Sequence, residues 1–363
     1  MRIGMEQVFQ SWGYTNCSDA QVFDEELKLA VQADQLGLDE VWVVEHHFED
    51  YSFCPDNFVY LSHVAALTKQ IKLATGAVIV PWNLQPLRVA EKAAMLDQLS
   101  GGRAILGLGR GLSRREYSQF GISMDEARGR FDEAAPMIIN ALETGVMEEH
   151  HGKYFDQPRA VIRPQPKSFK GRIKQVAMSP DSVEEAAMLG AQMMQFTYKA
   201  IEVHKQEIDN YNAAFRKHHG RAAPVPIMTD ITVCDTNADR AAENAHKYIR
   251  AYLLSVMHHY EMMGDHFKGA KGYEAYGDAA EAMNKMGLDA VAEGYVAGQV
   301  WGTPQQMLDG FAKRRAAIGD FDVLMIPRFA GMPFEVAERT LKTFAEKVAP
   351  ELRSWNMAET QAA

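Results

Sequence analysis

The sequence predicts an α/β protein built as a (β/α)8 TIM barrel with insertions between its units. Continuous apolar segments rich in β-branched residues alternate with amphipathic helical segments, which is typical of a parallel sheet covered on both faces. We count about eight such units, and the 363 residues leave room for insertions beyond the ~250 of a typical barrel. A doubly wound open sheet is the alternative architecture. It requires a reversal of strand order, which a sequence alone does not display.

The units of the first half follow one another with few interruptions. Gly37 and the pair Gly101–Gly102 stand after helical segments, as expected of C-terminal caps. Strands are predicted over residues 2–9, 38–44, 71–81 and 103–111, and helices over residues 19–37, 58–70, 86–102 and 125–145.

The second half resumes the alternation, with two interruptions. Strands are predicted over residues 173–179, 192–198, 225–235 and the end of the unit 293–329, and helices over residues 182–191, 199–220, 238–263 and 335–353. Residues 147–171, which contain several prolines, are expected to form an irregular excursion. Residues 264–294, rich in glycine and aromatic residues, are expected to form a mobile lid. We predict one domain over residues 1–355 and a frayed tail over residues 356–363.

The composition argues against several classes of partner. With 47% hydrophobic and 24% charged residues, the chain resembles ordinary soluble globular proteins. A formal net charge of -10 argues against nucleic acid or an anionic membrane. No apolar run approaches the roughly 20 residues of a membrane helix, and the start MRIGMEQVFQ lacks a signal pattern. Cys17, Cys54 and Cys234 have no metal spacing, so a reducing cytoplasm is the predicted location.

Glu45, His46 and His47 follow the strand that is predicted to end at Val44, so they lie at its carboxyl end. In a barrel, this end of each strand faces the active site. Adjacent residues of an extended segment point to opposite sides, so we expect at most one of the two histidines to face the site. The same geometry argues against a chelating metal pair. The alternative is that Glu45 pairs within the barrel and both histidines are structural.

The segment LGLGRGLS, residues 106–113, is a glycine-rich turn after a strand. Its backbone N–H groups can hold a phosphate, and Arg110 can add a charge-assisted contact. As a dinucleotide fingerprint the segment fails, because Leu112 stands where the third glycine or alanine belongs. The alternative is a tight turn with a solvated arginine.

Two further strands carry candidate binding residues. Ser179 and Ser182 lie where a strand meets a helix, so they are either ordinary N-caps or part of a phosphate site. Gly76 and Ala77 lie within a predicted strand, where glycine marks a close backbone approach or a bulge. Residues 258–266 hold several histidines and acids but match no metal spacing, so no metal is predicted.

Taken in order, these stretches resemble the bacterial luciferase-like family of flavin-dependent monooxygenases. The segments that carry the resemblance are VWVVEHHF, ATGAVIVP, QPLRVAEKAAMLDQLSGGR, GLGRGLSRREYSQFGISMDEAR and GTPQQMLDGF. The resemblance runs from about Met1 to about Trp355 and is most specific in the amino-terminal third. It implies a barrel that holds reduced FMN at the carboxyl ends of its strands.

The resemblance also implies roles for individual residues. His46 corresponds to the catalytic histidine beside the flavin, with Glu45 as a buried supporting group. Gly76–Ala77 corresponds to a non-proline cis peptide under the isoalloxazine ring. Residues 264–294 take the place of the family's mobile lid. Residues of two loops correspond to the site of the FMN phosphate: Arg110, Gly111, Leu112, Ala177, Met178, Ser179 and Ser182.

The sequence departs from the luciferase pattern at two positions. Gly109 stands where luciferases have a reactive cysteine, and Met178 stands where they have a glutamate. These changes argue against light emission and leave the parts that bind FMN in place.

The activity implied by the resemblance is that of a two-component monooxygenase. Reduced FMN from a separate NAD(P)H:flavin reductase would react with O₂ to a C4a-peroxyflavin. This would oxygenate an apolar aldehyde or ketone, as in alkanal monooxygenases and type II Baeyer–Villiger enzymes. The alternatives are an F420-dependent dehydrogenase on the same barrel and a non-catalytic flavin-binding protein. The implied assembly is a homodimer.

Overall fold

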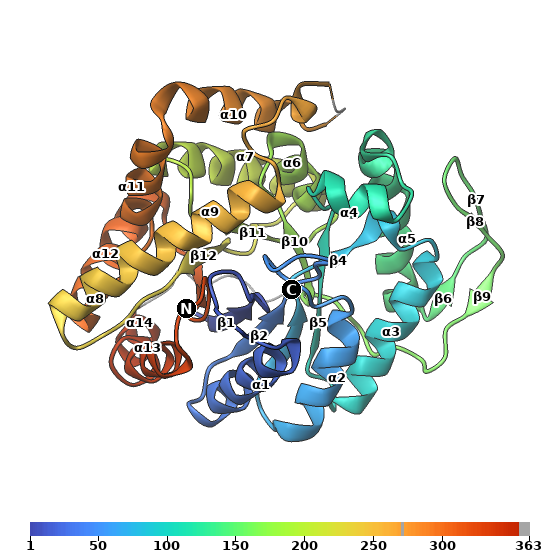
Figure 1. Cartoon of the computed structure of the whole chain (residues 1–363). Helices are drawn as coiled ribbons and strands as arrows, with labels where there is room; N and C mark the ends of the chain where they lie inside the picture. The colour runs from blue at the N-terminus through green and yellow to red at the C-terminus, as the bar shows by residue number, and fades with distance from the viewer. Residues whose placement is uncertain (270–271, 356–363) are drawn as a thin grey trace.

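The computed structural model describes residues 1–269 and 272–355 and shows a closed barrel of parallel strands surrounded by helices (Figure 1). The barrel strands are β1 (Ile3–Gln7), β2 (Glu40–Val43), β3 (Lys72–Thr75), β5 (Ala104–Gly109), β10 (Ile173–Val176), β11 (Gln192–Phe196), β12 (Ile227–Ile231) and β13 (Asp322–Ile326). They pair in chain order, and the circle closes because β13 pairs with β1. This order confirms the predicted (β/α)8 barrel and excludes the doubly wound sheet.

Helices follow the strands and cover the outside of the barrel (Figure 1). The longer ones are α1 (Asp19–Gln35), α2 (Asn57–Leu67), α3 (Pro86–Leu99), α5 (Ala127–Thr144), α6 (Pro180–Met188), α7 (Ile201–His219), α9 (Arg250–His259), α12 (Pro304–Ile318) and α13 (Phe334–Lys347). Shorter helical pieces are α4 (Arg114–Gln119), α8 (Ala238–Asn244), α14 (Ala349–Ser354), η1 (Val80–Trp82), η2 (Met124–Glu126) and the π-helical turn η3 (Ala245–Ile249).

Several helices begin and end where the sequence supplies a cap. Ser18 accepts a hydrogen bond from the backbone N–H of Gln21 at the start of α1. Ser179 and Thr303 form capping boxes at the starts of α6 and α12. Gly145 closes α5 with a φ of 76°, a left-handed conformation that favours glycine.

Polar side chains at the amino-terminal ends of the strands form what we call the floor network. Arg2 donates to Asp322 at 3.0 Å and contacts Glu40 at 3.3 Å. Gln192 accepts from Arg2 at 2.5 Å, accepts from the ammonium group of Lys174, and donates to Asp322 at 2.9 Å. The polar groups of the floor therefore satisfy one another.

An apolar layer fills the barrel interior. Its buried members come from six of the eight barrel strands and are Trp42, Ala74, Ile105, Met194, Ile227 and Leu324. Because this layer and the floor network occupy the interior, the barrel is a packed core. A ligand must therefore bind at the carboxyl ends of the strands.

The segment 147–171 is more ordered than its prolines suggested. The two-residue strands β6 (Val146–Met147) and β9 (Ala160–Val161) pair with each other, as do β7 (His150–His151) and β8 (Asp156–Gln157). Phe155, Ile162 and Phe169 are buried and anchor the segment. Glu133 of α5 accepts N–H groups of Tyr154 and Phe155 at 3.1 and 2.9 Å. The expectation of an irregular excursion is therefore wrong in part.

The segment 264–294 is mostly helical. It contains η4 (His266–Gly269), α10 (Glu274–Met286) and the start of α11 (Leu288–Gly298), and residues 270–271 lie outside the described part. Ala292 of α11 packs against Leu253 and Met257 of α9, which holds α11 on the barrel. The role of residues 264–294 as a mobile lid stays a prediction.

Two other expectations concern the ends of the chain and the membrane. The predicted frayed tail, residues 356–363, lies outside the described residues. None of the helices in the described part of the chain combines the length and apolarity needed to cross a membrane.

Candidate active site

His46 lies at the barrel mouth, three residues after the end of β2, where it contacts a buried carboxylate. Its Nδ1 is 3.0 Å from Oε1 of Glu116, and the same oxygen accepts the backbone N–H of His47 at 2.7 Å. Glu116 lies in the first turn of α4 because Ser113 caps that helix and accepts the N–H of Glu116. The chain thus fixes both the carboxylate and the imidazole.

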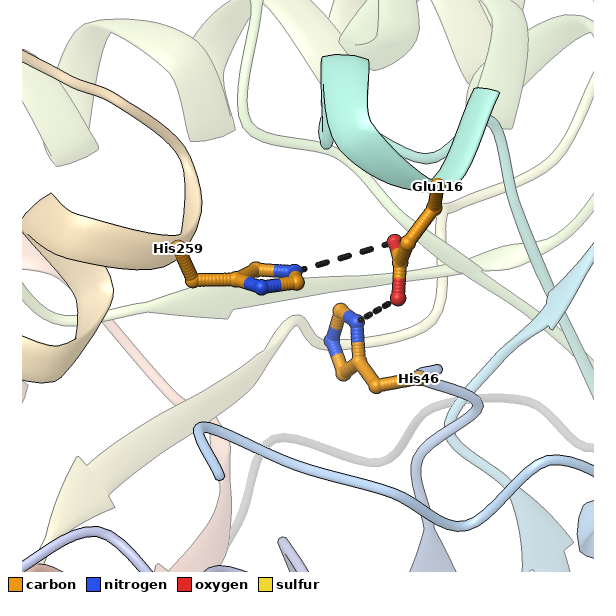
Figure 2. Close-up of side chains that lie close together, drawn as sticks. All are labelled: His46, Glu116 and His259. Atoms are coloured by element: carbon orange, nitrogen blue, oxygen red, sulfur yellow. Dashed lines mark hydrogen bonds and ion pairs between the residues drawn. The ribbon is translucent and has the colours of Figure 1, made fainter. Parts of the chain in front are cut away.

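A second histidine faces the other oxygen of this carboxylate (Figure 2). Nε2 of His259, the last residue of α9, is 3.7 Å from Oε2 of Glu116. Its Nδ1 is 2.8 Å from a carboxylate oxygen of Glu49, and the hydroxyl of Tyr260 is 3.2 Å from Nε2 of His46. We call His46, Glu116 and His259 the His–Glu–His cluster.

The His–Glu–His cluster has the residue types of a metal site. One ligand atom from each residue lies within 4.8 Å of the others. The sequence singled out residues 258–266 and predicted no metal there. Only His259 of that stretch joins the cluster, so the absence of a metal stays a prediction.

The cluster holds a buried negative charge. Burial alone would raise the pKa of Glu116, but the neighbouring imidazoles of His46 and His259, together with the hydrogen bond to His46, lower it to about 2. Glu116 is therefore ionised at neutral pH and stabilises a positive charge on a neighbouring imidazole.

Glu45 and His47, the chain neighbours of His46, contact other residues of the barrel mouth. Glu45 is buried, as the resemblance implied, and accepts the N–H of Ile79 at 3.0 Å and the indole N–H of Trp82 at 2.6 Å. The ring of His47 packs against those of Trp82 and Phe120. The imidazoles of His46 and His47 thus face different surroundings, as their adjacency predicted.

The backbones of two neighbouring strands approach closely at glycine residues, with Gly76 just after β3 and Gly107 on β5. The Gly76–Ala77 peptide bond is cis, as predicted, and Asn57 donates to the Ala77 carbonyl at 3.1 Å. A Cβ at Gly107 would lie 2.0 Å from the carbonyl oxygen of Thr75, so only glycine allows this approach.

Arg110 and Arg128 form a cationic corner at the mouth. Arg110 follows β5, and its guanidinium lies 4.2 Å from the centre of the Tyr273 ring. Within the described residues, Nη1 of Arg110 and Nη2 of Arg128 are buried without a hydrogen-bond partner. A Cβ at Gly272 would lie 2.8 Å from Arg110 Nη1 and 3.8 Å from Arg128 Nε, so both arginines border this residue. Unpartnered guanidinium nitrogens at one corner suit an anion.

Helix α6 starts beside this corner. Arg128 lies 3.1 Å from Glu185 and 3.6 Å from Asp181, both on α6. Burial, followed by a hydrogen bond with Asp132, raises the pKa of Glu185 to about 9. Arg128 also lies 3.8 Å from Asp132, so three carboxyl groups surround its guanidinium.

Ser179 and Ser182 act as caps in this structure. Their hydroxyls are 3.0 Å apart, and Ser182 donates to the Ser179 carbonyl at 2.8 Å. The strand residues before them are held by the barrel. The Ala177 N–H bonds the Met194 carbonyl at 2.9 Å, and the Met178 carbonyl accepts from Lys199 at 2.9 Å.

The loop after Arg110 connects the cationic corner to the predicted lid. Gly111 has a φ of 79°, and its carbonyl accepts the hydroxyl of Tyr273 at 2.9 Å. Leu112 packs on the cluster that contains Trp82 and Phe267.

Sequence reasoning missed Glu116, Tyr260 and Arg128, and it considered His259 only within the stretch 258–266, for which it predicted no metal. The run SRRE, residues 113–116, has the spacing of a capping box, which would have placed an acid in a helix start. His259 and Arg128 carry no local signal, because their partners lie far away in the sequence.

The fold is a closed parallel barrel whose mouth carries the His–Glu–His cluster and a pair of arginines. Residues 1–320 match the model of the luciferase-like monooxygenase family, and the chain belongs to this family. The match confirms the resemblance seen in the sequence. Relatives of the chain are named monooxygenases, and this one is an enzyme of the flavin-dependent monooxygenase class.

Curated relatives match the chain over different lengths. The protein y4vJ of Sinorhizobium fredii is 32% identical over 40% of this chain and 41% of its own length. The oxygenase component of the flavin-dependent trigonelline monooxygenase of Acinetobacter baylyi is 29% identical, over 60% of this chain and 61% of that protein. The alkanal monooxygenase alpha chain of Photobacterium leiognathi is 24% identical over 93% of this chain and 95% of that one.

Solved structures share the fold. The monooxygenase RslO1 of Streptomyces bottropensis has a TM-score of 0.77 and 28% identity, over 97% of this chain and 100% of that one. The oxygenating constituent of 3,6-diketocamphane monooxygenase from Pseudomonas putida, in complex with FMN, has a TM-score of 0.75 and 19% identity, over 97% and 98%. An F420-dependent secondary alcohol dehydrogenase has a TM-score of 0.70 and 18% identity, over 96% and 98%.

Proposed function

We propose that the chain is the oxygenase of a two-component, FMN-dependent monooxygenase that oxygenates an apolar aldehyde or ketone. The observation that carries this proposal is the cationic corner, where Arg110 and Arg128 each keep a buried nitrogen without a hydrogen-bond partner. This corner lies at the same barrel mouth as His46.

The residues at the mouth fit FMN. A phosphate carries negative charge and several acceptor oxygens, which Nη1 of Arg110, Nη2 of Arg128 and the N-terminus of α6 can satisfy. The backbone at Gly76–Ala77 carries no side chain larger than a methyl group, which suits contact with a flat ring system. We therefore propose that Arg110, Arg128 and the start of α6 hold the phosphate.

Bound reduced FMN supplies the electrons with which O₂ is activated. The protein's own part is to hold a proton at a defined place and to keep water out. His46 is fixed through Nδ1 by Glu116, which leaves Nε2, beside the Tyr260 hydroxyl, as the atom that gives or takes a proton. Tyr273 covers Arg110 and would shield the phosphate from solvent.

The names of relatives support our proposals for the substrate class and for the partner protein. The name of alkanal monooxygenase refers to aldehydes, and the name of 3,6-diketocamphane monooxygenase refers to a ketone. Both are apolar carbonyl compounds. The trigonelline enzyme is described as an oxygenase component, which supports a separate flavin reductase. We further propose a homodimer and, from the free Cys17, Cys54 and Cys234, a reducing cytoplasm as its location.

An F420-dependent dehydrogenase is the second candidate, because an enzyme with that cofactor shares the fold. The two candidates differ in their need for O₂. We expect purified protein with reduced FMN and ¹⁸O₂ to convert a medium-chain aldehyde or a cyclic ketone to a product with one ¹⁸O atom. Hydride transfer with F420 under argon, without labelled product from any substrate, would contradict the proposal.

A further inference from the structure

The turn between β10 and α6 is held by three side chains of the next strand–helix unit. The amide of Gln195, on β11, donates to the Ala177 carbonyl at 3.1 Å. The ammonium group of Lys199, in the loop after β11, donates to the Met178 carbonyl at 2.9 Å. Both donors also bind Glu207 of α7. We call Gln195, Lys199 and Glu207 the turn clamp.

Glu207 joins the two donors because each of its carboxylate oxygens accepts one of them. Oε1 accepts from Lys199 at 2.6 Å, and Oε2 accepts from the Gln195 amide at 2.7 Å. The amide is fixed on its other side too, where Nδ1 of His204 lies 3.0 Å from Gln195 Oε1. Burial and the positive charge of Lys199 lower the pKa of His204 to about 4, so this imidazole is neutral and can donate one N–H. The donors that hold the two carbonyls are therefore fixed themselves.

The turn clamp contains a charged pair that is largely closed to water. Gln195 is fully buried, and the side chains of Lys199 and Glu207 are 17% and 9% exposed. Taking two charges out of water is costly, and apolar residues of similar volume often stabilise a fold equally well. Stability alone therefore does not account for this pair. A fixed geometry of the turn is what the pair adds.

The clamped carbonyls determine how the chain enters α6. In a planar trans peptide the C=O and the following N–H point in opposite directions, so the clamped Met178 carbonyl turns the N–H of Ser179 away from Lys199. That N–H meets the Ser182 hydroxyl at 2.9 Å, and the Ser182 N–H meets Ser179 Oγ at 3.4 Å. The turn clamp thus sets the capping box at the start of α6.

We propose that Lys199 and Glu207 are positioning residues for the phosphate site, which hold the start of α6 in the orientation that binds the phosphate. This inference rests on the proposed function, in which the start of α6 binds the phosphate together with Arg110 and Arg128. The charges of Lys199 and Glu207 balance each other at 2.6 Å. The turn clamp therefore acts through geometry and adds no net charge to the site.

The test compares a buried and an exposed charged pair next to the same helix. In Lys199→Met/Glu207→Leu, apolar side chains replace the buried pair, so the fold is kept while the Met178 carbonyl loses its donor. We expect the affinity for reduced FMN to fall about tenfold and that for reduced riboflavin, which has no phosphate, to stay unchanged in an anaerobic titration. Lys205→Met/Asp209→Leu is the matched control, because this pair of α7 has the same charges at 2.7 Å but is exposed. It should bind both flavins as the original protein does.

Gln195→Met is a second variant, which frees the other carbonyl of the turn. It removes the donor to Ala177, and we expect a loss of roughly threefold in the affinity for reduced FMN alone. It decides the question by itself if the double variant does not fold. Denaturant unfolding of each variant is measured in parallel, because a merely structural role would lower stability and weaken the binding of both flavins alike. Equal losses for the two flavins, or unchanged affinity for reduced FMN in the folded variants, would overturn the proposal.

The original protein separates this inference from the proposed function. If it binds reduced FMN no more tightly than reduced riboflavin, the phosphate site is wrong, and the inference fails with it. If it prefers reduced FMN and the folded variants keep the same preference, only the inference is overturned.

Discussion

The two ends of the barrel differ in whether their polar side chains have hydrogen-bond partners. At the amino-terminal end, the floor network of Arg2, Glu40, Lys174, Gln192 and Asp322 pairs each charged or amide side chain with another. At the carboxyl end, buried atoms of several side chains have no hydrogen-bond partner within the described residues. These side chains are Arg110, Arg128, Glu116, His259 and Glu6.

The difference separates stability from function. A buried polar group without a partner costs about 1–3 kcal/mol, so a fold under selection for stability alone would pair it. The floor achieves this pairing. The mouth keeps its unpartnered atoms, which is what a site for an anionic ligand and a moving proton requires. Substitutions at the two ends should therefore give different kinds of defect.

The largest effect is expected at the mouth, from His46→Ala. Loss of the acid–base group should lower the rate of monooxygenation by roughly 10²- to 10⁴-fold, while the affinity for reduced FMN changes little. Steady-state kinetics with a carbonyl substrate and an anaerobic flavin titration measure the two quantities. His63→Ala, an exposed histidine on α2, is the matched control. Full activity of folded His46→Ala would show that this residue is not catalytic.

The next effect is expected from Arg110→Ala, which removes one cation of the anion corner. A charge-assisted hydrogen bond of about 1.5–3 kcal/mol corresponds to a roughly ten- to hundredfold loss of affinity for reduced FMN. Reduced riboflavin, which has no phosphate, should bind the variant and the original protein equally. Arg114→Ala, on the exposed side of α4, serves as the control. Equal losses for both flavins would contradict a phosphate contact.

Asp322→Ala tests the floor, with a smaller expected effect. It leaves Arg2 without the carboxylate that accepts its Nε–H at 3.0 Å and its backbone N–H at 2.8 Å. Because Arg2 is partly exposed, we expect a loss of about 2 kcal/mol in the free energy of unfolding. Denaturant unfolding gives the loss, and the affinity of the folded protein for reduced FMN should stay within about twofold. A large loss of affinity without loss of stability would contradict the division between floor and mouth.

Glu6→Gln should give the smallest effect, and one that depends on pH. Burial raises the pKa of Glu6 well above its ordinary 4.5. Above pH 4.5 the unfolded chain releases this proton while the folded protein keeps it, so the original protein loses stability as pH rises. The slope is about 1.4 kcal/mol per pH unit. Glutamine does not titrate, so the stability of Glu6→Gln relative to the original protein should increase by about this amount between pH 5 and 6. If urea unfolding gives the same stability difference between Glu6→Gln and the original protein at pH 5 and at pH 6, this prediction is wrong.

Much of the fold could be predicted from the sequence because a parallel barrel leaves a strong local pattern. Buried strands such as β2 and β5 are continuous apolar runs, and glycine and serine mark the ends of many helices. The insertions could not be predicted in this way. Residues 147–171 gain their order from distant contacts such as Glu133 with Tyr154, and no periodicity records such contacts.

The site was predictable where its residues follow strands. Glu45, His46 and Arg110 lie within three residues of the ends of β2 and β5, so the rule for barrel active sites points to them. The cis bond at Gly76–Ala77 entered only through the family resemblance. His259 comes from a helix more than 200 residues after His46. Its place in the cluster results from the closing of the barrel, which the sequence alone does not display.

The central claim is that Arg110 and Arg128 at the mouth hold the phosphate of a reduced flavin. The most direct measurement is an anaerobic fluorescence or calorimetric titration of the purified protein with reduced FMN, reduced riboflavin and reduced F420. The account predicts saturable binding of reduced FMN, at least about tenfold tighter than that of riboflavin. No binding of reduced FMN, equal binding of riboflavin, or tighter binding of F420 would contradict it.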